Sequence, residues 1–334
     1  MINSRNLFVL FLALILVTSV SSVALAQHDD VHNDEDYSTT PLVQPTVEDF
    51  APLPIPEVGE DGKPITESPM GVNGYFEMSE QLKVFSLTPN YRFSEKFALK
   101  ARLPYIMERT RTYWNGEESS SGLGDIGLEG EFTHQFSSPS KLLRVQGTVK
   151  LPTGDNENMV GDDDVKIPLG TGSVDMMLRG QYTQSSQKFG LLASALFRMN
   201  ASGESVFETI NPDGSVASTE TVNQTNGNEF VASVFGRHVV GNGIWLNLGA
   251  SVMMTGDGEA TYQSNDFDPT TSDLIQTSTL LDIYPGVSYR FGPITPYLGA
   301  RIPLSTSYDN EFLAEQRDTV YIFQLTYRPF AMVD

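Results

Sequence analysis

Apolar and polar residues alternate along most of the chain after Met70, and this period of two predicts β-strands rather than helices. Segment 244–255 shows the pattern most clearly. Its apolar face carries Ile244, Leu246, Leu248, Ala250, Val252 and Met254, and its other face carries Trp245, Asn247, Gly249, Ser251 and Thr255. Segments 143–151 and 294–304 repeat this arrangement. Each strand therefore presents one face suited to hydrocarbon and one that tolerates water.

The connections between these segments alternate in length. The short ones are 94–96, 137–140, 185–187, 240–243 and 292–293, and the long ones are 113–121, 153–172, 201–226, 256–275 and 305–317. A soluble β-sandwich also shows alternating strands, but short turns at one end and long loops at the other are typical of an outer-membrane barrel. We therefore predict an all-β, transmembrane, antiparallel up-and-down barrel over residues 70–334.

The connections also predict the number of strands. If the short turns are periplasmic, the last strand, 318–330, ends in the periplasm and strand 82–93 begins outside. The chain then needs one more strand, 70–78, to reach the outside. The total is twelve, an even number as bacterial barrels require, with ten and fourteen as alternatives.

The first 69 residues have a different character. The pattern is that of a signal peptide: Arg5 is followed by an apolar run over 7–17 and by small residues up to Ala26. The apolar run is shorter than the roughly 20 residues of a helix that spans a bilayer, which favours a cleaved signal peptide over a membrane anchor. Segment 27–69 holds eleven acidic residues, seven prolines and the single basic residue Lys63. Such a segment buries little apolar area, so we predict a disordered periplasmic leader after cleavage near Ala26.

Composition excludes several classes of protein. The chain has 42 Asp and Glu residues against 21 Lys and Arg, which gives a net charge of -21. This acidity would repel phosphate backbones and excludes nucleic acid as a partner. The absence of Cys excludes disulfides and thiolate sites. We predict no cofactor.

Charged residues fall on the strand face opposite the apolar stripe, which is the face that we expect to line the lumen. The basic ones are Lys100, Arg102, Arg144, Lys150, Arg179, Arg198, Arg290 and Arg301, and the acidic ones are Glu77, Asp125, Glu129, Glu131, Asp175 and Asp282. Opposite charges on adjacent strands stabilise each other. They could fill and rigidify the barrel or line a polar conduit, and twelve strands allow a narrow or gated pore.

Three apparent motifs do not fit their context. Residues 122–127 match G-x-G-x-x-G, but no helix follows, so a tight strand entry explains the glycines better than a dinucleotide site. One predicted outer loop carries Asp155, Glu157, Asp162, Asp163 and Asp164 without the spacing of a Ca²⁺ loop, which favours a solvated loop touching cations between lipid head groups. His134 and His238 lack a local Ser partner pattern, so we predict no enzymatic activity.

Three segments carry a family resemblance: 121–126 (SGLGDI), 151–155 (LPTGD) and 170–175 (GTGSVD). Their order and spacing resemble the outer-membrane transporter family associated with the meta-pathway of phenol degradation. The resemblance implies a barrel that passes small, often aromatic, organic molecules. The matching positions, to which the resemblance assigns no role, are Gly122, Gly124, Asp125, Pro152, Gly154, Gly170 and Gly172.

Three functions remain open from the sequence. The first is an outer-membrane channel or transporter for small organic solutes. The second is a structural or adhesive barrel with a plugged lumen, and the third is an outer-membrane lipid hydrolase. For such a barrel we expect outer-membrane lipid, the barrel assembly machinery and small organic solutes as partners. The ending is atypical for a barrel, because Phe330 is followed by residues 331–334 rather than being last.

Overall fold

The computed structural model describes residues 69–327, with internal gaps. The gaps are 114–115, 139, 156–158, 161–164, 187, 211–215, 242, 265–266, 275–276, 292 and 309–318. The predicted signal peptide and all but the last residue of the predicted leader lie outside the described residues. Within the described part of the chain, no helix is both long and apolar enough to cross a membrane.

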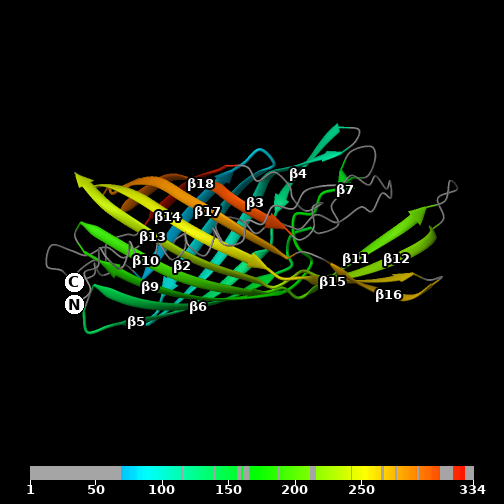
Figure 1. The fold of residues 1–334 in the computed structure, drawn as a ribbon, viewed down its shortest axis with the longest axis horizontal. Coiled ribbons are helices and arrows are strands. Elements are labelled where there is room, and N and C mark those ends of the chain that lie inside the picture. The colour runs from blue at the N-terminus through cyan, green and yellow to red at the C-terminus, as the bar shows by residue number, and fades with distance from the viewer. Residues whose placement is uncertain are drawn as a thin grey trace. The chain divides into compact units, whose positions relative to one another are not determined.

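Twelve antiparallel strands close into a barrel (Figure 1). They are β1 (Met70–Met78), β2 (Leu82–Arg92), β3 (Phe97–Tyr113), β5 (Ile126–Gln135), β6 (Lys141–Leu151), β9 (Asp175–Ser185), β10 (Phe189–Met199), β13 (Glu229–Gly241), β14 (Ile244–Thr255), β17 (Ser278–Tyr289), β18 (Ile294–Tyr308) and β19 (Val320–Tyr327). Each pairs with the next barrel strand along the chain, and β1 pairs with β19, from Val72 with Tyr327 to Met78 with Tyr321. The all-β class and the count of twelve are confirmed.

The long connections are more ordered than we expected, since several form strands rather than loops. They contain β4 (Gly116–Leu123), β7 (Met159–Val160), β8 (Val165–Lys166), β11 (Ser202–Ile210), β12 (Val216–Thr225), β15 (Gly258–Ser264) and β16 (Phe267–Leu274). A four-stranded sheet has the order β11-β12-β15-β16. Its sequences, such as VASTETVNQT in β12, are rich in β-branched residues but lack a continuous apolar stripe, so the hydrophobic pattern did not reveal them.

The outer face of the barrel is apolar. Along β14, Leu246, Leu248 and Met254 are exposed, whereas Ser251 on the other parity is buried. The short-turn end carries exposed aromatic residues, namely Tyr91, Phe93, Phe97, Phe136, Phe189, Tyr289, Phe291 and Tyr327. An apolar band that ends in an aromatic girdle is the outer surface of a transmembrane barrel.

Candidate functional site in the barrel interior

The charged residues predicted to face the lumen lie on the inner side of the barrel. Glu77, Asp125, Glu131, Arg144, Lys150, Asp175, Arg198 and Asp282 are buried, and Lys100, Arg102, Glu129, Arg179, Arg290 and Arg301 are half-buried. Their strand neighbours of the opposite parity, such as Leu99, Leu103 and Leu178, are exposed on the outside. That these charged residues line a path for solutes stays a prediction.

Glu131 on β5 is the centre of one charge cluster. Its carboxylate lies 2.8 Å from Lys100 Nζ and 3.0 Å from an Arg92 guanidinium nitrogen, and it accepts a 3.0 Å hydrogen bond from Gln146 Nε2. Arg144 Nε lies 3.9 Å away, and Lys100 also reaches Glu129 at 2.6 Å. These partners come from β2, β3 and β6, so the cluster crosses four neighbouring strands. A buried carboxylate is retained only with such compensation.

A second group of charges lies toward the long-loop end. Lys150 on β6 forms an ion pair with Asp175 on β9, and its Nζ lies 3.7 Å from Asp125. Arg198 on β10 lies 3.2 Å from Glu229 on β13. The two groups together cross-link strands between β2 and β13 on the inner wall.

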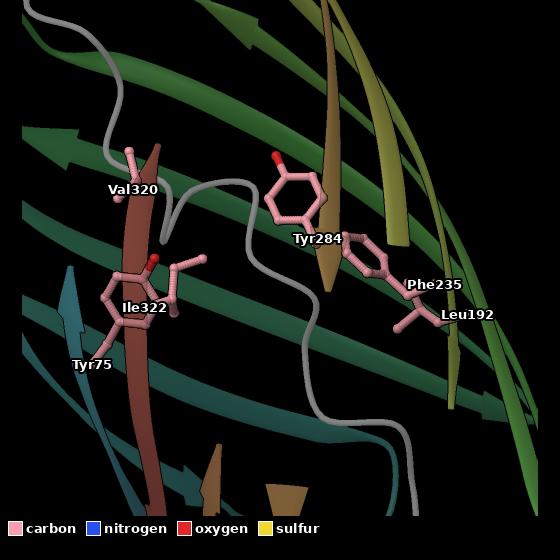
Figure 2. Packing of buried hydrophobic residues seen from close by; sticks show 6 residues of the cluster. All are labelled: Tyr75, Leu192, Phe235, Tyr284, Val320 and Ile322. Carbon is pink, nitrogen blue, oxygen red and sulfur yellow. The ribbon is translucent and has the colours of Figure 1, made fainter. Parts of the chain in front are cut away.

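Apolar and aromatic side chains cover the inner face elsewhere. The cluster comprises Tyr75, Leu192, Phe235, Tyr284, Val320 and Ile322, with Tyr297 packed against it. Figure 2 shows Val320, Ile322 and Tyr75 together on β19 and β1, and Tyr284 next to Phe235. The rings of Phe235 and Tyr284 have centroids 5.3 Å apart, and the hydroxyl of Tyr284 lies 3.1 Å from Ser251 Oγ. The inner face therefore combines this apolar and aromatic cluster with charged side chains, and the printed ion pairs join strands β2 to β13.

Several inner residues were not identified from the sequence. Arg92 and Glu229 lie near strand ends, where the face of a residue is hard to assign. Arg237 on β13 is buried, and its guanidinium carbon lies 4.1 Å from the centroid of the Trp245 ring, a cation–π contact. Both faces of β13 are largely apolar, so alternation alone could not show which face is inside.

The family-motif residues meet at one place. The carboxylate of Asp125, between β4 and β5, accepts hydrogen bonds from the backbone N–H groups of Gly154 and Thr171. Gly122 lies in β4, so the expected strand entry at 122–127 is instead the break between β4 and β5. Gly170 and Gly172 flank Thr171, and Pro152 is exposed at the end of β6.

Of the candidate metal loop and the two histidines, only part lies among the described residues. Asp155 is exposed, while Glu157, Asp162, Asp163 and Asp164 lie outside the described residues. Among the residues that the structure describes, no group of three or more His, Asp or Glu side chains could hold a metal ion. His134 and His238 are exposed on the outward parity of β5 and β13, and His134 contacts Phe136 edge-on at 5.1 Å.

Comparison with solved structures shows the fold. An outer-membrane channel from Pseudomonas putida F1 matches with a TM-score of 0.54 at 13% identity, over 82% of this chain and all of that one. The toluene transporter TodX of Pseudomonas putida matches at a TM-score of 0.45 and 12% identity, over 78% of this chain and 88% of that one. No protein-family model and no curated protein sequence matches this chain. The first likeness shows that this chain shares the β-barrel fold of that channel, and the resemblance to the phenol-degradation family stays a prediction.

Proposed function

We propose that the protein is an outer-membrane channel for small organic solutes. The observation that carries the proposal is a closed barrel whose outer face is apolar and whose inner face carries both charged and aromatic side chains. A closed barrel pairs every spanning strand, which is what a lipid environment requires of a β-structure. On this proposal the chain reaches the outer membrane after signal-peptide removal near Ala26, and its partners are lipid, the barrel assembly machinery and its solutes.

The outer surface supports residence in a membrane. Soluble monomers rarely expose a contiguous apolar patch larger than a few hundred Å². Here the side chains of Leu99, Leu178, Leu248 and Leu298, on four different strands, are all more than half exposed. In water this apolar belt would drive aggregation. In a bilayer it contacts the lipid tails instead of water, so its exposure carries little free-energy cost.

The inner surface supports an organic solute. Tyr75, Phe235, Tyr284 and Tyr297 lie on the inner face, and where the interior opens their rings would pack against an apolar or aromatic group of a solute. The charged residues around Glu131 can hydrogen-bond to water and to the polar groups of the same solute. Small molecules with both an apolar body and a polar group suit this pairing of surfaces better than sugars or inorganic ions do.

A structural or adhesive barrel with a filled interior is the second candidate, and one observation favours it. Leu192 is 0% exposed and Tyr284 and Tyr75 are each 2% exposed, although all three face the inside. In a wide, water-filled pore these side chains would be wet. The burial of these three side chains supports an interior that is filled around this cluster.

Conductance of the refolded protein separates the two candidates. A channel should give discrete current steps in planar bilayers, and liposomes that contain it should swell in small aromatic alcohols or acids faster than protein-free liposomes do. A heat-modifiable, fully folded barrel that gives neither steps nor swelling would favour the structural role. The Leu192→Ala variant widens the closed region and should raise the conductance of a channel but not of a plugged barrel.

A further inference from the structure

Residues 167–169, which belong to the connection between β6 and β9 (residues 152–174), return into the barrel at its long-loop end. Leu169 in this connection is 6% exposed and packs against Val84 on β2 and Ile106 on β3. These two partners face the inside, because their neighbours Phe85 and Tyr105 are exposed on the outside. The β6–β9 connection therefore reaches past β5 to the inner wall of β2 and β3.

A single carboxylate holds both ends of this connection. Asp125 Oδ1 accepts a 3.0 Å hydrogen bond from the backbone N–H of Gly154. Asp125 Oδ2 accepts one of 2.8 Å from the backbone N–H of Thr171 and one of 2.9 Å from its hydroxyl. Gly154 lies near the beginning of the connection and Thr171 near its end, so Asp125 ties the two ends of the loop together at their base.

The glycines at this base allow the two backbones to touch. A Cβ atom on Gly154 would lie 2.8 Å from Gly170 Cα, and one on Gly170 would lie 2.8 Å from the carbonyl oxygen of Gly154 and closer still to the Asp125 carboxylate. A larger residue at either position would force the ends apart. The three segments of the family resemblance thus build one closed base.

Two further contacts fix the part that enters the barrel. The guanidinium of Arg109, on β3, donates a hydrogen bond to the carbonyl oxygen of Pro168. The backbone N–H of Leu169 donates to the carbonyl oxygen of Asp155 at 2.6 Å. These two hydrogen bonds and the apolar contact of Leu169 together hold residues 167–169 against the inner wall.

We propose that residues 167–169 are the size-determining constriction at the long-loop end of the barrel, with Asp125 as the residue that positions it. The inference rests on the proposed channel function. A folded-in loop narrows the path that side chains alone would leave in a twelve-stranded barrel. Asp125 does not meet the solute; it acts by holding the loop ends, and its loss frees residues 167–169 from the wall.

Conductance of the Asp125→Asn variant tests the constriction. Asn keeps the shape but loses one acceptor atom and the charge, so single-channel conductance should rise by about twofold or more as the path widens, and swelling assays should admit larger solutes. The matched control is Asp257→Asn, because Asp257 accepts from Thr277 N at 3.1 Å and Thr277 Oγ1 at 2.7 Å in a different connection. Its conductance should stay that of the wild type. Unchanged conductance of a folded Asp125→Asn barrel would overturn the proposal.

A thiol assay tests the position of the loop without any current. The chain has no Cys, so Leu169→Cys introduces a single thiol that should react slowly with a water-soluble maleimide in the folded barrel. Adding Asp125→Asn should accelerate that reaction at least about tenfold, since one tenfold step corresponds to only about 1.4 kcal/mol of lost protection. A second variant, Leu169→Cys with Ile106→Cys, should form a disulfide under mild oxidation.

The two assays separate failure of the inference from failure of the channel function. If the wild type does not conduct but labelling is slow and accelerates in the Asp125 variant, the loop is held as described and the channel function is wrong. If the wild type conducts but the thiol of Leu169→Cys reacts quickly, or no disulfide forms, the constriction is wrong and the channel function stands. Oxidising the disulfide pair in the Asp125→Asn background should restore the low conductance.

Discussion

Leu248 provides the sharpest test of the lipid-facing surface. It lies near the middle of the 12-residue strand β14 and is 57% exposed on the outside. Replacing it with Arg places a guanidinium in the hydrocarbon, at a cost of roughly 2–4 kcal/mol near the bilayer midplane. Since about 1.4 kcal/mol is tenfold, the folding equilibrium should fall by a factor of about 30 to 1,000. Urea unfolding in lipid vesicles, followed by tryptophan fluorescence, measures this loss.

The neighbouring residue gives the matched control. Asn247 faces the inside, where its side chain donates a 3.1 Å hydrogen bond to Ser288 Oγ. Asn247→Arg loses this bond and places a cation opposite Arg237 on the adjacent strand, so we expect a penalty of about 1 kcal/mol. The difference between the two variants should therefore exceed about 1 kcal/mol.

A second pair repeats the test on another wall of the barrel. Val149 faces outward on β6, whereas Thr148 faces inward opposite Glu129. Val149→Arg should lower the free energy of unfolding by as much as Leu248→Arg does. Thr148→Arg should leave it unchanged or raise it, because the new guanidinium lies opposite the Glu129 carboxylate. Equal losses within both pairs would refute the assignment of inner and outer faces.

Three further predictions concern charge and orientation. Because the predicted lumen residues are eight basic and six acidic ones, we expect a weak anion preference in moderate salt, and changing Arg144 and Arg179 together to Gln should shift it toward cations. An unchanged reversal potential would show that these two residues do not line the path. Glu131→Gln leaves several inner cations without their carboxylate and should lower the free energy of unfolding by about 3–5 kcal/mol, measured by urea titration and contradicted by a neutral result. Protease added to intact cells should cut within 201–226 or 256–275, whereas cleavage confined to the N-terminal segment would contradict the predicted orientation.

The barrel strands were predictable because lipid imposes a local rule. Every second residue of a spanning strand must be apolar, so the alternation can be recognised within a single segment without knowing its partner strands. The predicted limits 70–78 and 244–255 are those of β1 and β14. The same rule does not operate beyond the bilayer, so the hydrophobic pattern predicts loops where the structure has β11, β12, β15 and β16.

The interior was only partly predictable, because its contacts join residues far apart in the sequence. Charged residues inside the barrel stand out among apolar neighbours, and parity placed them on the inner face. The inner apolar cluster does not stand out in the sequence, since Phe235 and Leu192 look like any other apolar residue. Asp125 binds Gly154 and Thr171, which lie 29 and 46 residues further along the chain. The sequence shows the three motif segments, but not that they come together to close the base of the β6–β9 connection.

The pairing of β1 with β19 makes folding a single event. Val72 pairs with Tyr327, so the last pairing to become available joins the two ends of the barrel sequence. Until β19 has been synthesised, the sheet has two open edges, which lipid cannot satisfy and which recruit other strands in water. Such long-range closure is slow. The open edges of the sheet must therefore be protected until β19 is complete, and a chain truncated before β19 keeps an unpaired edge on β1.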